Sequence, residues 1–124
     1  MGSLTKSFED YLEAIYLLEQ EKGSARVKDV AKRLGVKLPS VTEAVRKMSK
    51  AGLIDFERYG LIRLTGQGRA LAKEVYKKHE ILFEFLHVML GVDKATALRD
   101  ACEMEHGLSN ATLNKLRQFM EKRR

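Results

Sequence analysis

Apolar residues recur along most of this chain at the three- and four-residue spacing of amphipathic α-helices. The helices expected from this spacing cover residues 7–22, 26–34, 38–50, 67–90 and 93–106, with a last one from 109 onward. Ser7, Thr65 and Ser109 are expected to cap the helices that they begin. Two short apolar stretches, 53–57 and 61–64, predict strands around a tight turn at Arg58-Tyr59-Gly60. The pattern therefore predicts a mainly α fold with one small β-hairpin.

The segment 24–64 has the order of elements found in a winged helix-turn-helix. The helices 26–34 and 38–50 are joined by Gly35-Val36-Lys37, and Pro39 falls in the first turn of the second helix, where it costs no hydrogen bond. A small shared core is expected from Val27, Val30, Ala31, Leu34, Val36, Val41, Ala44, Val45 and Met48. An ordinary helical hairpin is the alternative, but a β-hairpin that directly follows the two helices favours a wing.

The charge distribution points to a polyanion as the partner of this segment. Residues 24–78 hold 14 basic and five acidic residues, a net charge of +9, whereas the rest of the chain carries −3. The phosphate backbone of double-stranded DNA is the leading candidate. The residues expected to contact DNA lie around the second helix and the wing: Arg26, Lys28, Lys37, Pro39, Ser40, Thr42, Glu43, Arg46, Lys47 and Arg58.

A second group of polar residues lies near the C-terminus. Cys102, Glu105 and His106 fall at i, i+3 and i+4 on one helix face, which they share with Leu98 and Ala101. A thiol, a carboxylate and an imidazole on an apolar surface are costly to bury unless a cation neutralises them, and a divalent transition metal is the simplest candidate. The alternative is a solvated helix face that carries an inert cysteine.

Three further residues have ordinary explanations when they are considered alone. Asp10 and Glu13 lie one turn apart on the first helix, where solvent exposure is the simplest account. His79 lies on an apolar helix face, where a histidine is more often a satisfied core residue than a ligand.

The single cysteine excludes an internal disulfide and suits a reducing cytoplasm. No apolar run approaches the roughly 20 residues of a membrane span, so no membrane partner is expected.

Four motifs together resemble the diphtheria toxin repressor family of iron- and manganese-dependent metalloregulators. They are Glu9-Asp10-Tyr11-Leu12-Glu13, Pro39-Ser40-Val41-Thr42, Tyr76-Lys77-Lys78-His79-Glu80, and Cys102 followed by Glu105-His106. The resemblance runs from about Phe8 to His106 and is closest to the shorter manganese-type members, which have no SH3-like domain. It implies a winged-helix DNA-binding domain over 1–70, including the first helix, and a helical dimerisation and metal-binding domain over 71–124.

The resemblance also implies a ligand set. Asp10 and Glu13 match the first-helix ligands of the manganese branch, and His79 matches a ligand of both branches. Glu105 and His106 match the ligand pair of the later helix, whereas Cys102 resembles the iron branch. Phe83 and Leu98 stand where the iron branch carries a Glu and a His of a second site. The metal is therefore expected to be Mn²⁺ or Fe²⁺, with Zn²⁺ and Co²⁺ possible, and one or two ions are compatible with the set.

The function implied by the resemblance is that of a metal-activated transcriptional repressor, a cytoplasmic homodimer that binds a palindromic operator near metal-uptake genes. A winged-helix regulator that responds to Zn²⁺ or to a small organic ligand is the alternative. A metallohydrolase with Glu105 or Glu13 as general base, or a metal-storage protein, would leave the basic segment without a role. An enzyme is therefore not expected.

Overall fold

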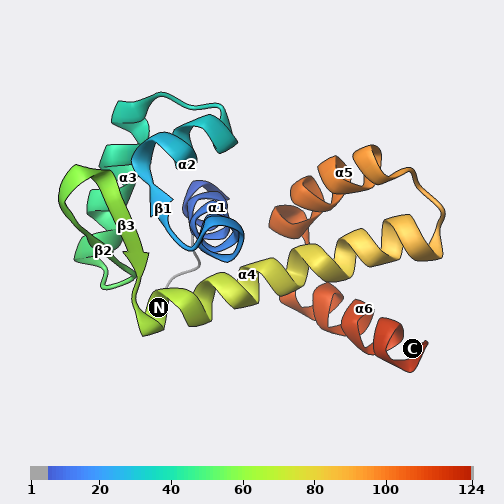
Figure 1. The fold of residues 1–124 in the computed structure, drawn as a ribbon. Helices are drawn as coiled ribbons and strands as arrows, with labels where there is room; N and C mark the ends of the chain where they lie inside the picture. Colours follow the sequence, from blue (N-terminus) through green and yellow to red (C-terminus); the bar gives the residue numbers. More distant parts are fainter. Residues whose placement is uncertain (1–5, 124) are drawn as a thin grey trace. The chain divides into compact units, whose positions relative to one another are not determined.

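The computed structural model describes residues 6–123, which form two compact units (Figure 1). The first unit ends at Val75 and the second begins at Tyr76, so the boundary falls within helix α4 (Gly66–Glu84). No helix in this described range is long and apolar enough to cross a membrane. Each unit has a hydrophobic core of its own.

The first unit is a winged helix-turn-helix, as the sequence predicts. Its elements are α1 (Lys6–Lys22), β1 (Ala25–Arg26), α2 (Val27–Leu34), α3 (Leu38–Lys50), β2 (Ile54–Phe56), the 3₁₀ turn η1 (Arg58–Gly60) and β3 (Leu61–Leu64). The three strands form an antiparallel sheet in the order β1-β3-β2, in which Ile54 lies opposite Leu64 and Ala25 opposite Ile62. Helices α1, α2 and α3 gather beside this sheet in Figure 1.

Helix α1 lies at the centre of the first core. Leu12 and Ile15 are fully buried, and α1 contacts α2, α3, β1 and β3. The core expected between α2 and α3 also forms, apart from its edge. Val27 and Leu34 are only partly buried. The buried residues of this core are Val30, Ala31, Val41, Ala44, Val45 and Met48. The two helices of the motif are thus held together by their apolar faces, which leaves their other faces for solvent or a ligand.

Some expectations for this unit are wrong in detail. Val36 was expected in the core but is 37% exposed, because it follows Gly35, whose left-handed φ of 67° turns the chain after α2. Arg26 was expected in the helix, but it pairs with Leu61 in the strand β1, and α2 begins at Val27. Ser7 lies inside α1 and does not cap it, since the helix begins at Lys6.

The second unit consists of the later part of α4, a π-helical turn η2 (Phe85–Met89), α5 (Lys94–Gly107) and α6 (Asn110–Lys122). The cap expected at Ser109 is confirmed, since its side chain accepts a hydrogen bond from the amide of Thr112. Asp93 caps α5 in the same way through the amide of Thr96. Hydrogen bonds from the Thr96 side chain and, after it, from the Thr96 amide hold the pKa of the Asp93 carboxyl below its usual range. The core of this unit contains Leu82, Leu86, Ala97, Ala101 and Leu113.

The exit from the wing into α4 depends on a close approach of two backbone segments. Thr65 caps α4 as expected, because its Oγ1 accepts from the amide of Gly68 at 3.0 Å. The same hydroxyl donates to the carbonyl of Gly52 at 2.7 Å, and the Thr65 amide donates to the carbonyl of Leu53 at 3.0 Å. A Cβ atom at Gly68 would lie only 1.8 Å from the Leu53 oxygen, so only glycine fits there.

We expect Gly68→Ala to lower the free energy of unfolding by about 1–3 kcal/mol, because the added methyl group forces Leu53 and α4 apart. Gly66→Ala is the matched control, since no atom lies within 4 Å of its added Cβ and alanine is the better helix former. Chemical denaturation of both variants measures the difference. Equal stabilities for the two variants would contradict the close approach.

Candidate metal centre and nucleic-acid interface

Helices α4 and α5 place four of the six expected metal ligands together in the second unit. Cys102, Glu105 and His106 lie on one face of α5, as their spacing predicts. The thiol of Cys102, a carboxylate oxygen of Glu105 and a ring nitrogen of His106 all lie within 4.8 Å of one another. His79 of α4 approaches this group at Glu105, since its Nδ1 lies 3.3 Å from Oε2 of that residue.

Glu105 is the buried charged residue at the centre of this group. Its side chain is 2% exposed, and its Oε1 lies 3.4 Å from Nε2 of His106. Neither of its oxygens accepts a hydrogen bond from any residue that the structure describes. A buried carboxylate without hydrogen bonds is costly unless a positive charge lies beside it. The Glu105 carboxylate thus lies beside the imidazole of His79 through one oxygen and beside that of His106 through the other. Imidazole, carboxylate and thiol groups fit a divalent transition metal by both charge and ligand type.

Asp10 and Glu13 belong to the first unit, where they lie one turn apart on α1. Both side chains are half-buried and are therefore not simply part of a solvated surface. Their neighbour Tyr11 is buried in the first core. Burial, and after it the negative charge of Glu43 on α3, raises the pKa of the Tyr11 phenol. Helix α1 thus carries two candidate ligands and also packs against the second helix of the helix-turn-helix.

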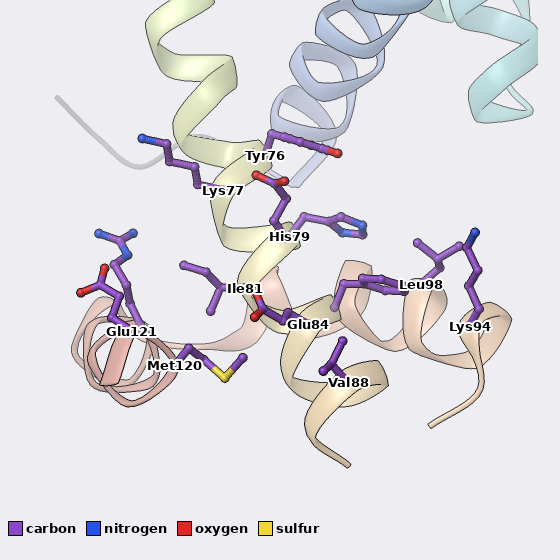
Figure 2. Close-up of a pocket in the computed structure, with 13 residues that line it drawn as sticks. Tyr76, Lys77, His79, Ile81, Glu84, Val88, Lys94, Leu98, Met120 and Glu121 are labelled. Atoms are coloured by element: carbon purple, nitrogen blue, oxygen red, sulfur yellow. The ribbon is translucent and has the colours of Figure 1, made fainter. Parts of the chain in front are cut away.

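A groove of about 790 Å³ lies in the second unit along α4, between α5 and α6 (Figure 2). His79 points into it from α4, while Leu98 extends from α5 and Met120 from α6. Phe83 also lines this groove. The side chains of Leu98 and Phe83 are apolar, so neither supplies a metal ligand to this groove.

The outer face of α3 presents most of the residues expected to contact DNA. Those that are exposed are Lys37, Pro39, Ser40, Glu43, Arg46 and Lys47, together with Lys28 on α2 and Arg58 in the wing. Glu43 and Lys47 form an exposed ion pair at 3.4 Å. Thr42 is half-buried and donates to the carbonyl of Leu38 at 3.1 Å. Arg26 is half-buried, and its Nη1 donates to the carbonyl of Tyr59 in the wing at 3.0 Å.

Glu19 is an important residue that the sequence analysis did not single out. Its side chain is 12% exposed and accepts hydrogen bonds from the amide of Leu64 at 3.1 Å and from Nη1 of Arg69 at 2.9 Å. These bonds tie the end of α1 to the wing strand β3 and to the start of α4. The partners lie 45 and 50 positions away in the chain, so no local pattern in the sequence indicates them.

Comparison with known proteins assigns a family domain to each half of the chain. Residues 3–62 match the N-terminal DNA-binding domain of iron-dependent repressors, and residues 65–124 match their metal-binding and dimerisation domain. An uncharacterized HTH-type transcriptional regulator of Methanocaldococcus jannaschii is 39% identical over 120 residues, which is 96% of each chain. The HTH-type transcriptional regulator MntR of Bacillus subtilis is 38% identical over 117 residues, or 94% of this chain and 82% of that one.

Solved structures share the fold of the whole described range. The IdeR protein of T. acidophilum superimposes with a TM-score of 0.82 at 26% identity, and the match covers 98% of this chain and 56% of that chain. The metal-dependent transcriptional regulator MtsR gives a TM-score of 0.84 at 29% identity and covers 95% and 55%. The chain thus spans little more than half the length of these two proteins.

Both halves of the chain match one family, and the resemblance noted in the sequence is confirmed. The helix-turn-helix unit corresponds to its DNA-binding domain, and the unit with the buried Glu105 corresponds to its metal-binding and dimerisation domain. The protein therefore belongs to the iron-dependent repressors, which are metal-dependent, DNA-binding transcriptional regulators.

Proposed function

We propose that this protein is a homodimeric transcriptional repressor whose affinity for a palindromic operator rises when it binds Mn²⁺ or Fe²⁺. The single observation that carries the proposal is the Glu105 carboxylate, which is buried without hydrogen bonds between His79 and His106. Burial of such a group is costly unless a positive charge lies beside it. The unit that carries it matches a metal-binding domain, and the other unit matches a DNA-binding domain.

The proposed ligand set is His79, Cys102, Glu105 and His106, completed by Asp10 and Glu13 from α1. Three carboxylates and two imidazoles are the oxygen-rich ligands that suit Mn²⁺ and Fe²⁺, while the thiol of Cys102 favours Fe²⁺, Co²⁺ or Zn²⁺. A solved relative at 29% identity is described as the manganese regulator SloR, and another as ScaR with bound Zn²⁺. These residues would hold the cation, whose positive charge would neutralise their carboxylates.

The residues of α1 connect this ligand set to the DNA-binding face. Asp10 and Glu13 lie on the same helix as Tyr11, which packs in the core with α3, and Glu19, which binds β3 and α4. A change in the position of α1 therefore moves the second helix and the wing together. In a dimer this sets the separation of two recognition helices, which must match half-sites about 34 Å apart or a multiple of that. Couplings of this kind are typically about 1–3 kcal/mol.

We also propose a domain boundary, roles for the DNA-contacting residues, and a cellular location for the protein. The domain boundary is placed at residues 70/71, so that the second domain begins in α4. Ser40, Glu43 and Arg46 are proposed to read base edges, and Lys28, Lys37, Lys47 and Arg58 to bind phosphates. The protein is proposed to act in the cytoplasm on metal-uptake genes and to have no catalytic activity, because the acidic residues are used as ligands.

Substitution of the buried carboxylate tests the metal centre. We expect Glu105→Gln to weaken Mn²⁺ binding by at least about tenfold, measured by isothermal titration calorimetry, with the circular dichroism spectrum unchanged. The matched control is Glu103→Gln, which alters an exposed carboxylate on the same helix and should bind Mn²⁺ like the wild type. Wild-type affinity in Glu105→Gln would refute the proposed centre.

Substitution on α3 separates DNA binding from metal binding. Arg46→Ala should weaken binding to operator DNA by about tenfold through the loss of a base or phosphate contact, while Mn²⁺ affinity stays unchanged. Lys115→Ala removes an exposed positive charge from α6 and serves as the control for net charge. Fluorescence anisotropy with a duplex selected from a random library measures both variants. An equal loss of DNA affinity in the two variants would show that only overall charge matters.

A further inference from the structure

Helix α6 carries a compact patch of positive charge in the second unit. Residues 109–123 hold four basic residues and one acidic residue, whereas residues 76–108 hold four basic and six acidic ones. Within α6, only Leu113 and Met120 are buried. The positive charge of this unit is thus concentrated on a helix that has most of its surface open to solvent.

Three of these four cations share one side of the helix with an aromatic ring. This set of residues, the α6 face, consists of Lys115, Phe119, Lys122 and Arg123. Their spacing of i, i+4, i+7 and i+8 places them together, and all four side chains are exposed, the ring by 40%. Arg117 and Glu121 lie on the opposite side, where they line the groove along α4. Among the described residues of α6, this face therefore holds cations and an apolar ring but no carboxylate.

The charges of the α6 face are not used within the protein. None of its three cations forms an ion pair with a carboxylate in residues 6–123, whereas the exposed Lys47 and Arg63 of the first unit are both paired. The Arg123 guanidinium instead lies over the Phe119 ring, with its Cζ 4.7 Å from the ring centroid. This cation–π contact holds an arginine and an aromatic ring together at the surface.

We propose that the α6 face binds an acidic segment of another protein, which places an apolar side chain on Phe119 and carboxylates beside the three cations. Aromatic residues and arginine are enriched at the strongest points of protein interfaces. Opposite charges around such a centre favour the correct partner and speed its association. The proposal adds a third ligand surface to the protein, separate from the metal centre and from α3.

A second copy of this chain fits the α6 face less well than an acidic partner does. In a two-fold dimer the same surface of each subunit meets at the interface, so three cations would face three cations. Like charges brought together in this way oppose association. The carboxylates of a different protein supply the charge that the α6 face lacks.

An anionic membrane or a DNA duplex also offers negative charge but makes less use of the aromatic ring. A helix that lies on a membrane needs a broad apolar face, whereas the apolar side of α6 is turned inward: Leu113 and Met120 are buried, and Leu116 packs on the core. Contacts to DNA phosphates come from cationic, polar and backbone groups, to which a phenylalanine adds nothing. An acidic peptide with an apolar side chain matches both the ring and the cations.

A synthetic acidic peptide tests the proposal on the full chain. The probe is a fluorescein-labelled helical peptide in which glutamates surround a leucine, and fluorescence anisotropy measures its affinity. Phe119→Ala should weaken peptide binding about tenfold, whereas Phe119→Tyr should bind like the wild type because the ring is kept. Arg123→Gln should also weaken binding. Its matched control, Arg117→Gln, removes the same charge from the opposite side of α6 and should leave binding unchanged. A peptide with glutamines in place of the glutamates should not bind.

Amide chemical shifts report on the same binding without any substitution. Titration of the isotope-labelled wild type with the peptide should shift the amides of residues 115–123 and leave those of α3 in place. A wild type that does not bind the peptide, or a Phe119→Ala variant that binds it with wild-type affinity, would overturn the proposal.

The other occupants of the α6 face are tested with the same variant. If Phe119→Ala loses affinity for a random DNA duplex or for phosphatidylglycerol vesicles but not for the peptide, the face binds DNA or a membrane and the proposal fails. If Phe119→Ala has a smaller mass than the wild type in sedimentation velocity, the face joins two copies of the chain and the proposal also fails. Mn²⁺ and operator affinities should be unchanged in all the α6 variants, so that each of these outcomes leaves the proposed function standing.

Discussion

The charge of the buried Glu105 carboxylate is the constraint on which the second unit depends. Its two oxygens face His79 and His106 without a hydrogen bond from the described residues, in a unit whose core is otherwise apolar. An ion in such surroundings destabilises the fold unless it is neutralised. The proposed divalent cation would therefore stabilise the structure of this unit when it binds, because binding and folding free energies are linked.

Helix α1 connects the elements of the DNA-binding unit to one another. The helix is central in the first core, and Glu19 near its end binds both the wing strand and the start of α4 through Leu64 and Arg69. The wing is in turn bonded to Arg26 at the start of α2. Because the core and these hydrogen bonds connect the elements of the DNA-binding unit, α3 and the wing respond together when α1 changes position.

Local signals in the sequence predicted much of this structure. Gly35 and Pro39 marked the helix-turn-helix, Thr65 and Ser109 marked helix starts, and the i, i+3, i+4 spacing placed Cys102, Glu105 and His106 on one face. Strand β1 was missed because two residues cannot show a periodicity, and it exists only through its pairing with β3. The roles of Glu19 and Arg26 depend on partners more than 30 positions away, which only the fold brings together.

Metal and operator DNA are proposed to bind cooperatively, and thermodynamic linkage allows this coupling to be measured from either ligand. Mn²⁺ affinity is measured by calorimetry with and without a selected operator duplex, and operator affinity is measured with and without saturating Mn²⁺. We expect each ligand to raise the affinity for the other by the same factor, about 5- to 150-fold. Operator binding that is identical in chelator and in Mn²⁺ would contradict it and would leave a DNA-binding protein without a metal switch.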